Sequence, residues 1–169
     1  ELALGRRHSV TIYARSPHKL PEEISSNLVT VVKGGVFESC FRPKEGVAPN
    51  YGVISALGPK FGQPSRNPLA AGYEDLLRLM YKYCIQRIVL LSTLSMSSPE
   101  DRFSIIREIL VAGIIIGYTA WTDVVAIGKF MQYGAAEGLD VTIARVARLN
   151  GADGGTLKVG FIGDGKVVG

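Results

Sequence analysis

A chain of 169 residues, 47% hydrophobic and 20% charged, can bury one ordinary core and is too short to divide comfortably into two. Its net charge of +4 comes from scattered Lys and Arg residues, which argues against a nucleic-acid or anionic-membrane surface. Cys40 and Cys84 lie in separate segments without a CxxC spacing, which argues against a disulfide framework and a metal site. We therefore expect a single cytoplasmic domain, residues 1–169, that binds no metal.

Five short apolar segments rich in β-branched residues predict strands. They are residues 10–14, 28–32, 52–57, 88–91 and 141–144. Runs of this length that are apolar on both sides are typical of strands in a parallel sheet covered on both faces. The longest apolar run, residues 109–117, is far shorter than the ~20 residues that a membrane span needs.

Helical patterns alternate with these strands. Residues 2–7 resemble the end of a helix, and residues 69–83, 103–117 and 122–136 have apolar side chains at helical spacing. Thr122 or Asp123 is expected to cap the last of them. The alternation predicts right-handed crossovers, and therefore an α/β fold with a doubly wound parallel sheet.

Two parts of the chain depart from this alternation. Pro43 and Pro49 limit any helix within residues 34–50 to about two turns, and the fold of that segment is not predicted. In residues 151–169, Gly and Asp cluster between short alternating runs, which predicts a small hairpin at the C-terminus.

Five segments, taken in order, resemble one known family. They read GRRHSVTIYARSPHKLP, NLVTVVKGG, GVISALGP, RIVLLSTLS and TIARVARL. The chain resembles the NmrA-like branch of the atypical short-chain dehydrogenase/reductases, and more narrowly the fungal NAD(P)-binding proteins of that branch. The resemblance implies a Rossmann-like sheet ordered 3-2-1-4-5-6. It also implies NADPH more often than NADH, and either reductase activity or a redox-sensing role.

The resemblance assigns site residues to the ends of strands. Arg15, which ends the strand beginning at Ser9, matches the position that selects NADP, with Lys19 close enough to help. The alternative is that Arg15 is only a solvated strand end. The other cofactor-binding matches are Ser55, Ala56, Leu57 and Gly58 in one loop, and Ser92 and Thr93 at the end of the next strand. Arg145 matches the Arg of a TIVRP-like strand, where Val146 replaces the usual Pro.

The sequence departs from the family in three ways. The family's opening strand and glycine-rich turn are absent, so no residue is assigned to the pyrophosphate, and Gly35 replaces an Asp on the adenine side. No Tyr-x-x-x-Lys pair follows Tyr81, Tyr118 or Tyr133. Because the absent strand would be the central one, we expect a chain truncated at its N-terminus, or one that naturally extends upstream.

These observations leave three hypotheses for function. The first is an NADPH-dependent reductase whose small aromatic acceptor, a flavin, quinone or tetrapyrrole, takes its proton from water, with Ser92 as the catalytic residue that orients the acceptor. The second is a non-catalytic NADP(H) sensor that passes its state to a protein partner. The third is an inactive truncated remnant.

Overall fold

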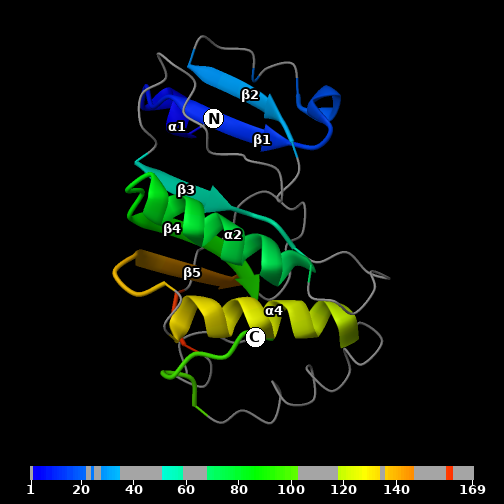
Figure 1. The fold of residues 1–169 in the computed structure, drawn as a ribbon, viewed down its shortest axis with the longest axis vertical. Coiled ribbons are helices and arrows are strands. Elements are labelled where there is room, and N and C mark those ends of the chain that lie inside the picture. The colour runs from blue at the N-terminus through cyan, green and yellow to red at the C-terminus, as the bar shows by residue number, and fades with distance from the viewer. Residues whose placement is uncertain are drawn as a thin grey trace. The chain divides into compact units, whose positions relative to one another are not determined.

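The computed structural model describes residues 2–21, 24, 28–34, 51–58, 68–102, 118–133, 136–146 and 159–161. These residues fall into two compact units, Glu1–Pro49 and Asn50–Gly169, whose α-helices and strands Figure 1 labels. Three parts of the chain lie outside the described residues: the segment 35–50, the predicted helix at 103–117, and most of the predicted C-terminal hairpin. Among the helices that are described, none is long and apolar enough to cross a membrane.

The first unit is built around a pair of parallel strands. It contains the short helix α1 (Leu2–Gly5), β1 (Val10–Ala14), the 3-10 turn η1 (Pro17–Lys19) and β2 (Val29–Lys33). β1 and β2 pair in parallel, from Val10 opposite Val29 to Ala14 opposite Lys33. No residue described in this unit is buried.

The second unit is a three-stranded parallel sheet with helices. It contains β3 (Gly52–Ser55), α2 (Pro68–Lys82), β4 (Arg87–Thr93), α4 (Tyr118–Gln132) and β5 (Asp140–Val146), and the strands lie in the order β3-β4-β5. The predicted α/β class with parallel strands is therefore confirmed. All five predicted strands form. Within each sheet, β1 lies beside β2, and β4 lies between β3 and β5, as the strand order of the family implies. The strand expected between the two sheets stays a prediction.

The core of the second unit lies between the helices and one face of the sheet. α2 and α4 contact each other, and α2 turns an apolar stripe inward. Its buried side chains are Leu69, Ala70, Tyr73, Leu76, Leu77 and Met80. β4 alternates between buried and half-buried positions, with Ile88 and Leu90 toward the core. The opposite surface of α2 carries Arg78, which forms exposed ion pairs with Glu74 and Asp75.

The apolar strands led us to expect coverage of both sheet faces, but among the described residues one side of β3 is exposed. Ile54, which pairs with Val89 on the face away from Leu90, is 84% exposed. β3 is the edge strand of the described sheet, and on its other face the buried Ser55 hydroxyl lies 2.6 Å from the hydroxyl of Tyr73 on α2. The β-branched pattern therefore identified a strand correctly, and coverage of its second face by the predicted helix at 103–117 stays a prediction.

Asp123 caps a helix, but not the one that the sequence suggested. α4 begins at Tyr118, one turn earlier than predicted, so neither Thr122 nor Asp123 caps it, and that prediction is wrong. The buried carboxylate of Asp123 instead accepts hydrogen bonds from the backbone N–H groups of Leu69 (3.4 Å) and Ala70 (2.9 Å). These are among the unpaired donors of the first turn of α2, so Asp123 satisfies a helix end from another helix.

α2 ends in a Schellman motif. The N–H of Ile85 donates to the carbonyl of Met80 (2.9 Å), and the N–H of Cys84 donates to the carbonyl of Tyr81 (3.3 Å). Cys84 has a φ of 53°, the left-handed conformation that Gly adopts at least cost. Ile85 and Met80 are both buried, as is typical of the apolar residues at these two positions of the motif.

Candidate functional site

The three strands of the second unit end at the same edge of their sheet, and a cavity lies there. The register places Ser55 opposite Leu90, and Thr93 opposite Val146. The cavity has a volume of about 270 Å³. Its lining is almost entirely apolar and consists of Ala56, Leu57, Gly58, Leu69, Tyr73, Leu90, Leu91, Ser92, Thr93, Met96, Val124, Ile127 and Val146. In open α/β sheets, ligands bind at the carboxyl ends of the strands, so this cavity is the candidate site of the unit.

The cavity brings together five of the residues that the sequence assigned to a cofactor. Ala56, Leu57 and Gly58 form the segment after β3, and Ser92 and Thr93 end β4. These residues lie more than 30 positions apart in the sequence, and the parallel register of β3 and β4 makes them neighbours. Their proximity is thus established, and their role in binding stays a prediction.

Ser55 differs from the residues that follow it, because it does not line the cavity. Its buried hydroxyl lies 2.6 Å from the hydroxyl of Tyr73 and accepts a weaker hydrogen bond, 3.4 Å, from the N–H of Leu57. Ser55 therefore links the wall residue Tyr73 to the loop that begins at Ala56. Sequence reasoning missed Tyr73, whose only signal was an aromatic residue on the buried stripe of α2.

Burial determines the protonation of Tyr73. Only 1% of this side chain is exposed, and burial raises the pKa of the phenol above its usual value of 10.0, although the hydrogen bond with Ser55 acts in the opposite direction. The phenol is thus neutral at physiological pH, because an anion in this position would lose its hydration. A neutral phenol can hold Ser55 in place by hydrogen bonding.

Ser92 is the polar group that the described residues leave available in this cavity. Ser92 is 8% exposed, and its hydroxyl makes no hydrogen bond within the described part of the chain. The neighbouring Thr93 hydroxyl accepts a hydrogen bond from the N–H of Ser95, at 3.4 Å. A buried hydroxyl without a partner costs free energy, so Ser92 is suited to a ligand that supplies one.

Met96 forms a wall of the cavity, and Gly128 makes room for it. Met96 is 2% exposed, and a Cβ atom added to Gly128 would lie 2.7 Å from its Cγ atom. Real Cβ atoms do not approach other carbons so closely, so any larger residue at 128 would displace Met96. The sequence signal for this contact was a Gly within a helical pattern, where the residue is otherwise unfavourable.

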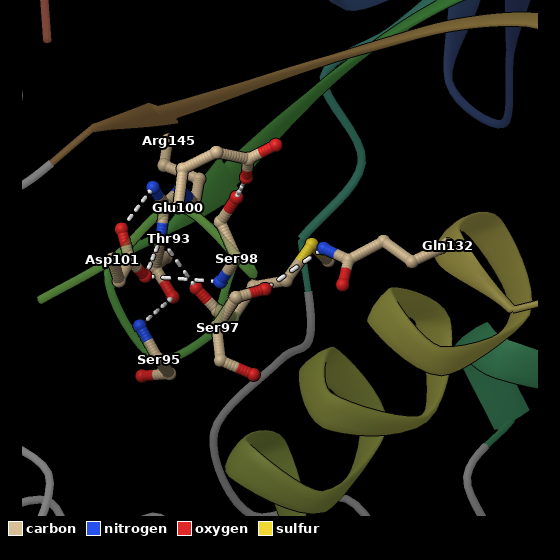
Figure 2. A network of polar contacts seen from close by, with 9 residues as sticks. Thr93, Ser95, Ser97, Ser98, Glu100, Asp101, Gln132 and Arg145 are labelled. Atoms are coloured by element: carbon tan, nitrogen blue, oxygen red, sulfur yellow. Dashed lines mark hydrogen bonds and ion pairs between the residues drawn. The ribbon is translucent and has the colours of Figure 1, made fainter. Parts of the chain in front are cut away.

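The loop that carries Met96 is fastened to β5 by a buried ion pair, drawn in Figure 2. Arg145 donates two hydrogen bonds to the carboxylate of Asp101, at 2.5 and 2.6 Å, and a third to the carbonyl of Met96, at 3.0 Å. The two side chains are 11% and 4% exposed. Arg145 is not part of the cavity lining, so in this chain it anchors the wall behind Met96.

Further hydrogen bonds order the same loop. The N–H of Ser98 donates to Asp101 at 2.9 Å, and the side-chain amide of Gln132 on α4 donates to the carbonyl of Ser97 at 2.8 Å (Figure 2). A hydrogen bond from the Ser98 hydroxyl lowers the pKa of the exposed Glu100. The loop is thus joined to both β5 and α4, which fixes one side of the cavity.

Arg15 and Lys19 belong to the first unit. Arg15 directly follows the carboxyl end of β1, and Lys19 closes η1. Both side chains are exposed, and neither forms an ion pair with any described residue. The predicted position of Arg15 at the carboxyl end of a parallel strand is therefore confirmed, and its contact with a phosphate stays a prediction. In the described ranges, no three His, Cys, Asp or Glu residues gather as metal ligands.

Comparison with known proteins agrees with this geometry. A search of curated proteins finds no match. Among solved structures, the oxidoreductase ylbE from Lactococcus lactis matches with a TM-score of 0.54 and 20% sequence identity. The match covers 81% of this chain and 57% of that one, so this chain spans little more than half of its structural relative. The likeness shows a shared Rossmann-like fold. A family model described as NAD(P)H-binding matches residues 1–169, and the chain therefore belongs to that NAD(P)H-binding family.

Proposed function

We propose that this chain is an NADPH-dependent oxidoreductase of the NmrA-like type that reduces a small aromatic acceptor such as a flavin, quinone or tetrapyrrole. The observation that carries the proposal is the apolar cavity at the carboxyl edge of the β3-β4-β5 sheet, in a chain of an NAD(P)H-binding family. The structural likeness to the oxidoreductase ylbE is consistent with it.

The residues around the cavity fit the nicotinamide end of such a cofactor. Apolar side chains such as Leu90, Met96 and Ile127 suit the faces of a planar ring. The Ser92 hydroxyl, buried and without a partner among the described residues, can bond to a carboxamide or to the acceptor. The volume of about 270 Å³ lies just below the roughly 300–1,000 Å³ typical of ligand pockets, so we assign one of the two reacting rings to the cavity and the other to its open side.

The chemistry assigned to the chain is mainly binding, orientation and exclusion of water. When bound, the dihydronicotinamide would supply a hydride, and the reduced acceptor would take the accompanying proton from water. Ser92 orients the reacting ring, and the wall containing Met96 keeps water from its far side. The phenol of Tyr73 shares a 2.6 Å hydrogen bond with Ser55 and has a raised pKa, so we assign it no proton transfer.

The preference for NADPH is assigned to the first unit. Arg15 stands at the carboxyl end of β1, where a guanidinium can bind a ribose 2′-phosphate with two parallel hydrogen bonds, and Lys19 adds a second positive charge. Both side chains are exposed and have no ion-pair partner in the described residues, so binding a phosphate would break no ion pair seen there.

A second candidate function is an NADP(H) sensor without turnover, which acts through a protein partner. One observation favours it: no acidic or basic side chain lines the cavity among the described residues, and Tyr73 is engaged with Ser55. A site of this kind can bind a dinucleotide yet lack a group that donates a proton. The two candidates share the same binding residues and differ in whether electrons leave the cofactor.

Binding is tested by titrating the chain with NADPH and NADH while the nicotinamide fluorescence is recorded. Arg15→Ala should weaken NADPH binding about 10- to 100-fold, the effect of losing a charged hydrogen-bonded contact, and leave NADH binding nearly unchanged. Arg6→Ala is the matched control, because Arg6 is an exposed arginine of the same unit that precedes β1. Equal loss in both variants, or equal affinity for NADPH and NADH, would contradict the assignment of Arg15.

Turnover is tested by adding a flavin or a quinone to the NADPH complex and following absorbance at the nicotinamide band. Oxidation of NADPH that depends on the protein, and that slows in Ser92→Ala while NADPH still binds, supports the reductase. Saturable binding with no oxidation supports the sensor. No binding of either dinucleotide rejects both candidates and leaves the inactive remnant.

A further inference from the structure

One wall of the cavity is a methionine side chain that lies against a glycine of α4. Met96 lines the cavity on one side and contacts Gly128 on the other. We infer that this contact sets the depth of the cavity, and with it the size of the ring that binds there. The inference rests on the proposed function, in that one of the reacting rings enters this cavity. Met96 and Gly128 then determine specificity and take no part in the chemistry.

The side chain of Met96 occupies the space that a side chain at position 128 would fill. A Cβ atom added to Gly128 would lie 2.7 Å from Cγ, 3.3 Å from Sδ and 3.4 Å from Cε of Met96. Both residues are buried, so neither can turn toward solvent without leaving the core. The position of Met96 therefore depends on the glycine at 128.

The backbone beside this contact is held in place. The carbonyl of Met96 accepts a hydrogen bond from Arg145 at 3.0 Å. The carbonyl of the next residue, Ser97, accepts one at 2.8 Å from Gln132, which lies one turn beyond Gly128 on α4 (Figure 2). Moving the loop away from α4 would break these hydrogen bonds. A larger residue at 128 is therefore accommodated by the side chain of Met96.

The space into which that side chain can move is the cavity itself. Methionine has three rotatable bonds and adapts its shape readily, whereas the surrounding core is closely packed. A displaced Met96 would enter the cavity and make it shallower. A shorter residue at 96 would make it deeper. Because an apolar pocket discriminates strongly against atoms that do not fit, either change alters which rings bind.

Two amides that differ by one fused ring measure this depth. Nicotinamide and quinoline-3-carboxamide carry the same carboxamide, and the second has an additional ring. Each is titrated into the full chain without a dinucleotide, and binding is followed by saturation-transfer NMR of the amide. Gly128→Ala should weaken binding of the two-ring amide about tenfold or more, and that of nicotinamide less, because the larger molecule reaches further toward Met96.

Met96→Ala tests the same contact in the opposite direction and introduces no clash. It should raise the affinity for the two-ring amide, relative to nicotinamide, at least about fivefold. The double variant Met96→Ala with Gly128→Ala should bind like Met96→Ala, since the added methyl group no longer meets a Cγ atom. Lys129→Ala is the control, because it also favours the helix but changes an exposed side chain, and it should leave both affinities unchanged.

The outcomes separate this inference from the proposed function. If Gly128→Ala leaves both affinities unchanged, or weakens binding equally with and without the Met96 side chain, the inference is wrong. If neither amide binds to the original chain or to Met96→Ala, the inference is also wrong, and the NADPH titration still decides the proposed function. If the amides respond as expected but NADPH does not bind, the depth assigned to Met96 and Gly128 is supported while the proposed function fails.

Discussion

The two units of this protein use the same kind of strand but differ in what surrounds it. β1 and β4 are both apolar strands with a parallel neighbour. Every position of β1 is half-buried, whereas Ile88 and Leu90 of β4 are buried beneath helices. No residue described in the first unit is buried, and every core residue described lies in the second.

Strands with the same local sequence pattern can therefore belong to units of different stability. A two-stranded sheet buries too little apolar surface to be stable by itself, whereas a three-stranded sheet covered by helices can form a core. The candidate cavity, the capped helix α2 and the ion pair of Arg145 all belong to the unit with the core. We therefore expect the second unit to hold its part of the site rigidly and the first to open more readily.

Amide hydrogen exchange should show the largest contrast between the units. The amides of Ile88 and Leu90 lie in the central strand of a covered sheet, and we expect their protection factors to exceed those of Val10 and Ile12 at least about a hundredfold. Protection factors, rather than raw rates, correct for the intrinsic exchange of each residue. Equal protection in β1 and β4 would show that the two units unfold as one.

Removing the buried ion pair of the second unit should cost far more than removing an exposed one. Arg145→Met removes two hydrogen bonds to Asp101 and one to Met96 from a pair whose side chains are 11% and 4% exposed, and we expect a loss of about 3–5 kcal/mol in the free energy of unfolding by urea. Arg78→Met is the matched control, because Arg78 also pairs with carboxylates but is largely exposed, and its loss should cost less than about 1 kcal/mol.

Similar losses in these two variants would contradict the structural role given to Arg145. A second readout tests the same role at the cavity. Because Arg145 also donates to the carbonyl of Met96, Arg145→Met should weaken NADPH binding by loosening the wall, whereas Arg78→Met should not.

The parts of the fold that were predictable are those encoded by neighbouring residues. The β-branched run at Val10–Ala14 and the apolar stripe of α2 specify their elements locally, and both formed within about a residue of their expected bounds. The proximity of Ser92 to the loop after β3 was also predictable, because the carboxyl ends of parallel strands lie at one edge of a sheet. Helix ends were less predictable, as the early start of α4 shows.

Contacts between distant residues were not predictable from one sequence. Asp123 satisfies backbone groups of Leu69 and Ala70 more than 50 positions away, and its sequence signal was an acid beside the apolar residues of a helix. The pair of Ser55 with Tyr73 likewise depends on how α2 packs on the sheet. Such contacts are set by tertiary packing, which residue spacing alone does not specify.

The smallest expected effect on stability comes from substitutions at the C-terminal ends of α1 and α2, which have the same backbone geometry. Arg7 in the first unit and Cys84 in the second both have φ near 60°, and each follows a helix closed by the same pair of backbone hydrogen bonds. A left-handed conformation costs a non-glycine residue about 1–2 kcal/mol, and the flexibility of Gly offsets part of that gain. Cys84→Gly should therefore stabilise the second unit by about 1 kcal/mol, a rise of about 2–4 °C in its Tm.

Arg7→Gly relieves the same strain, yet its effect depends on how the units unfold. If the first unit opens independently, Arg7→Gly slows amide exchange in β1 and leaves the main thermal transition unchanged, because that transition reports the core around Ile88 and Leu90. If instead Arg7→Gly raises the main Tm as much as Cys84→Gly does, the units melt together. In that case the first unit would be no less stable than the second, although fewer of its residues are buried.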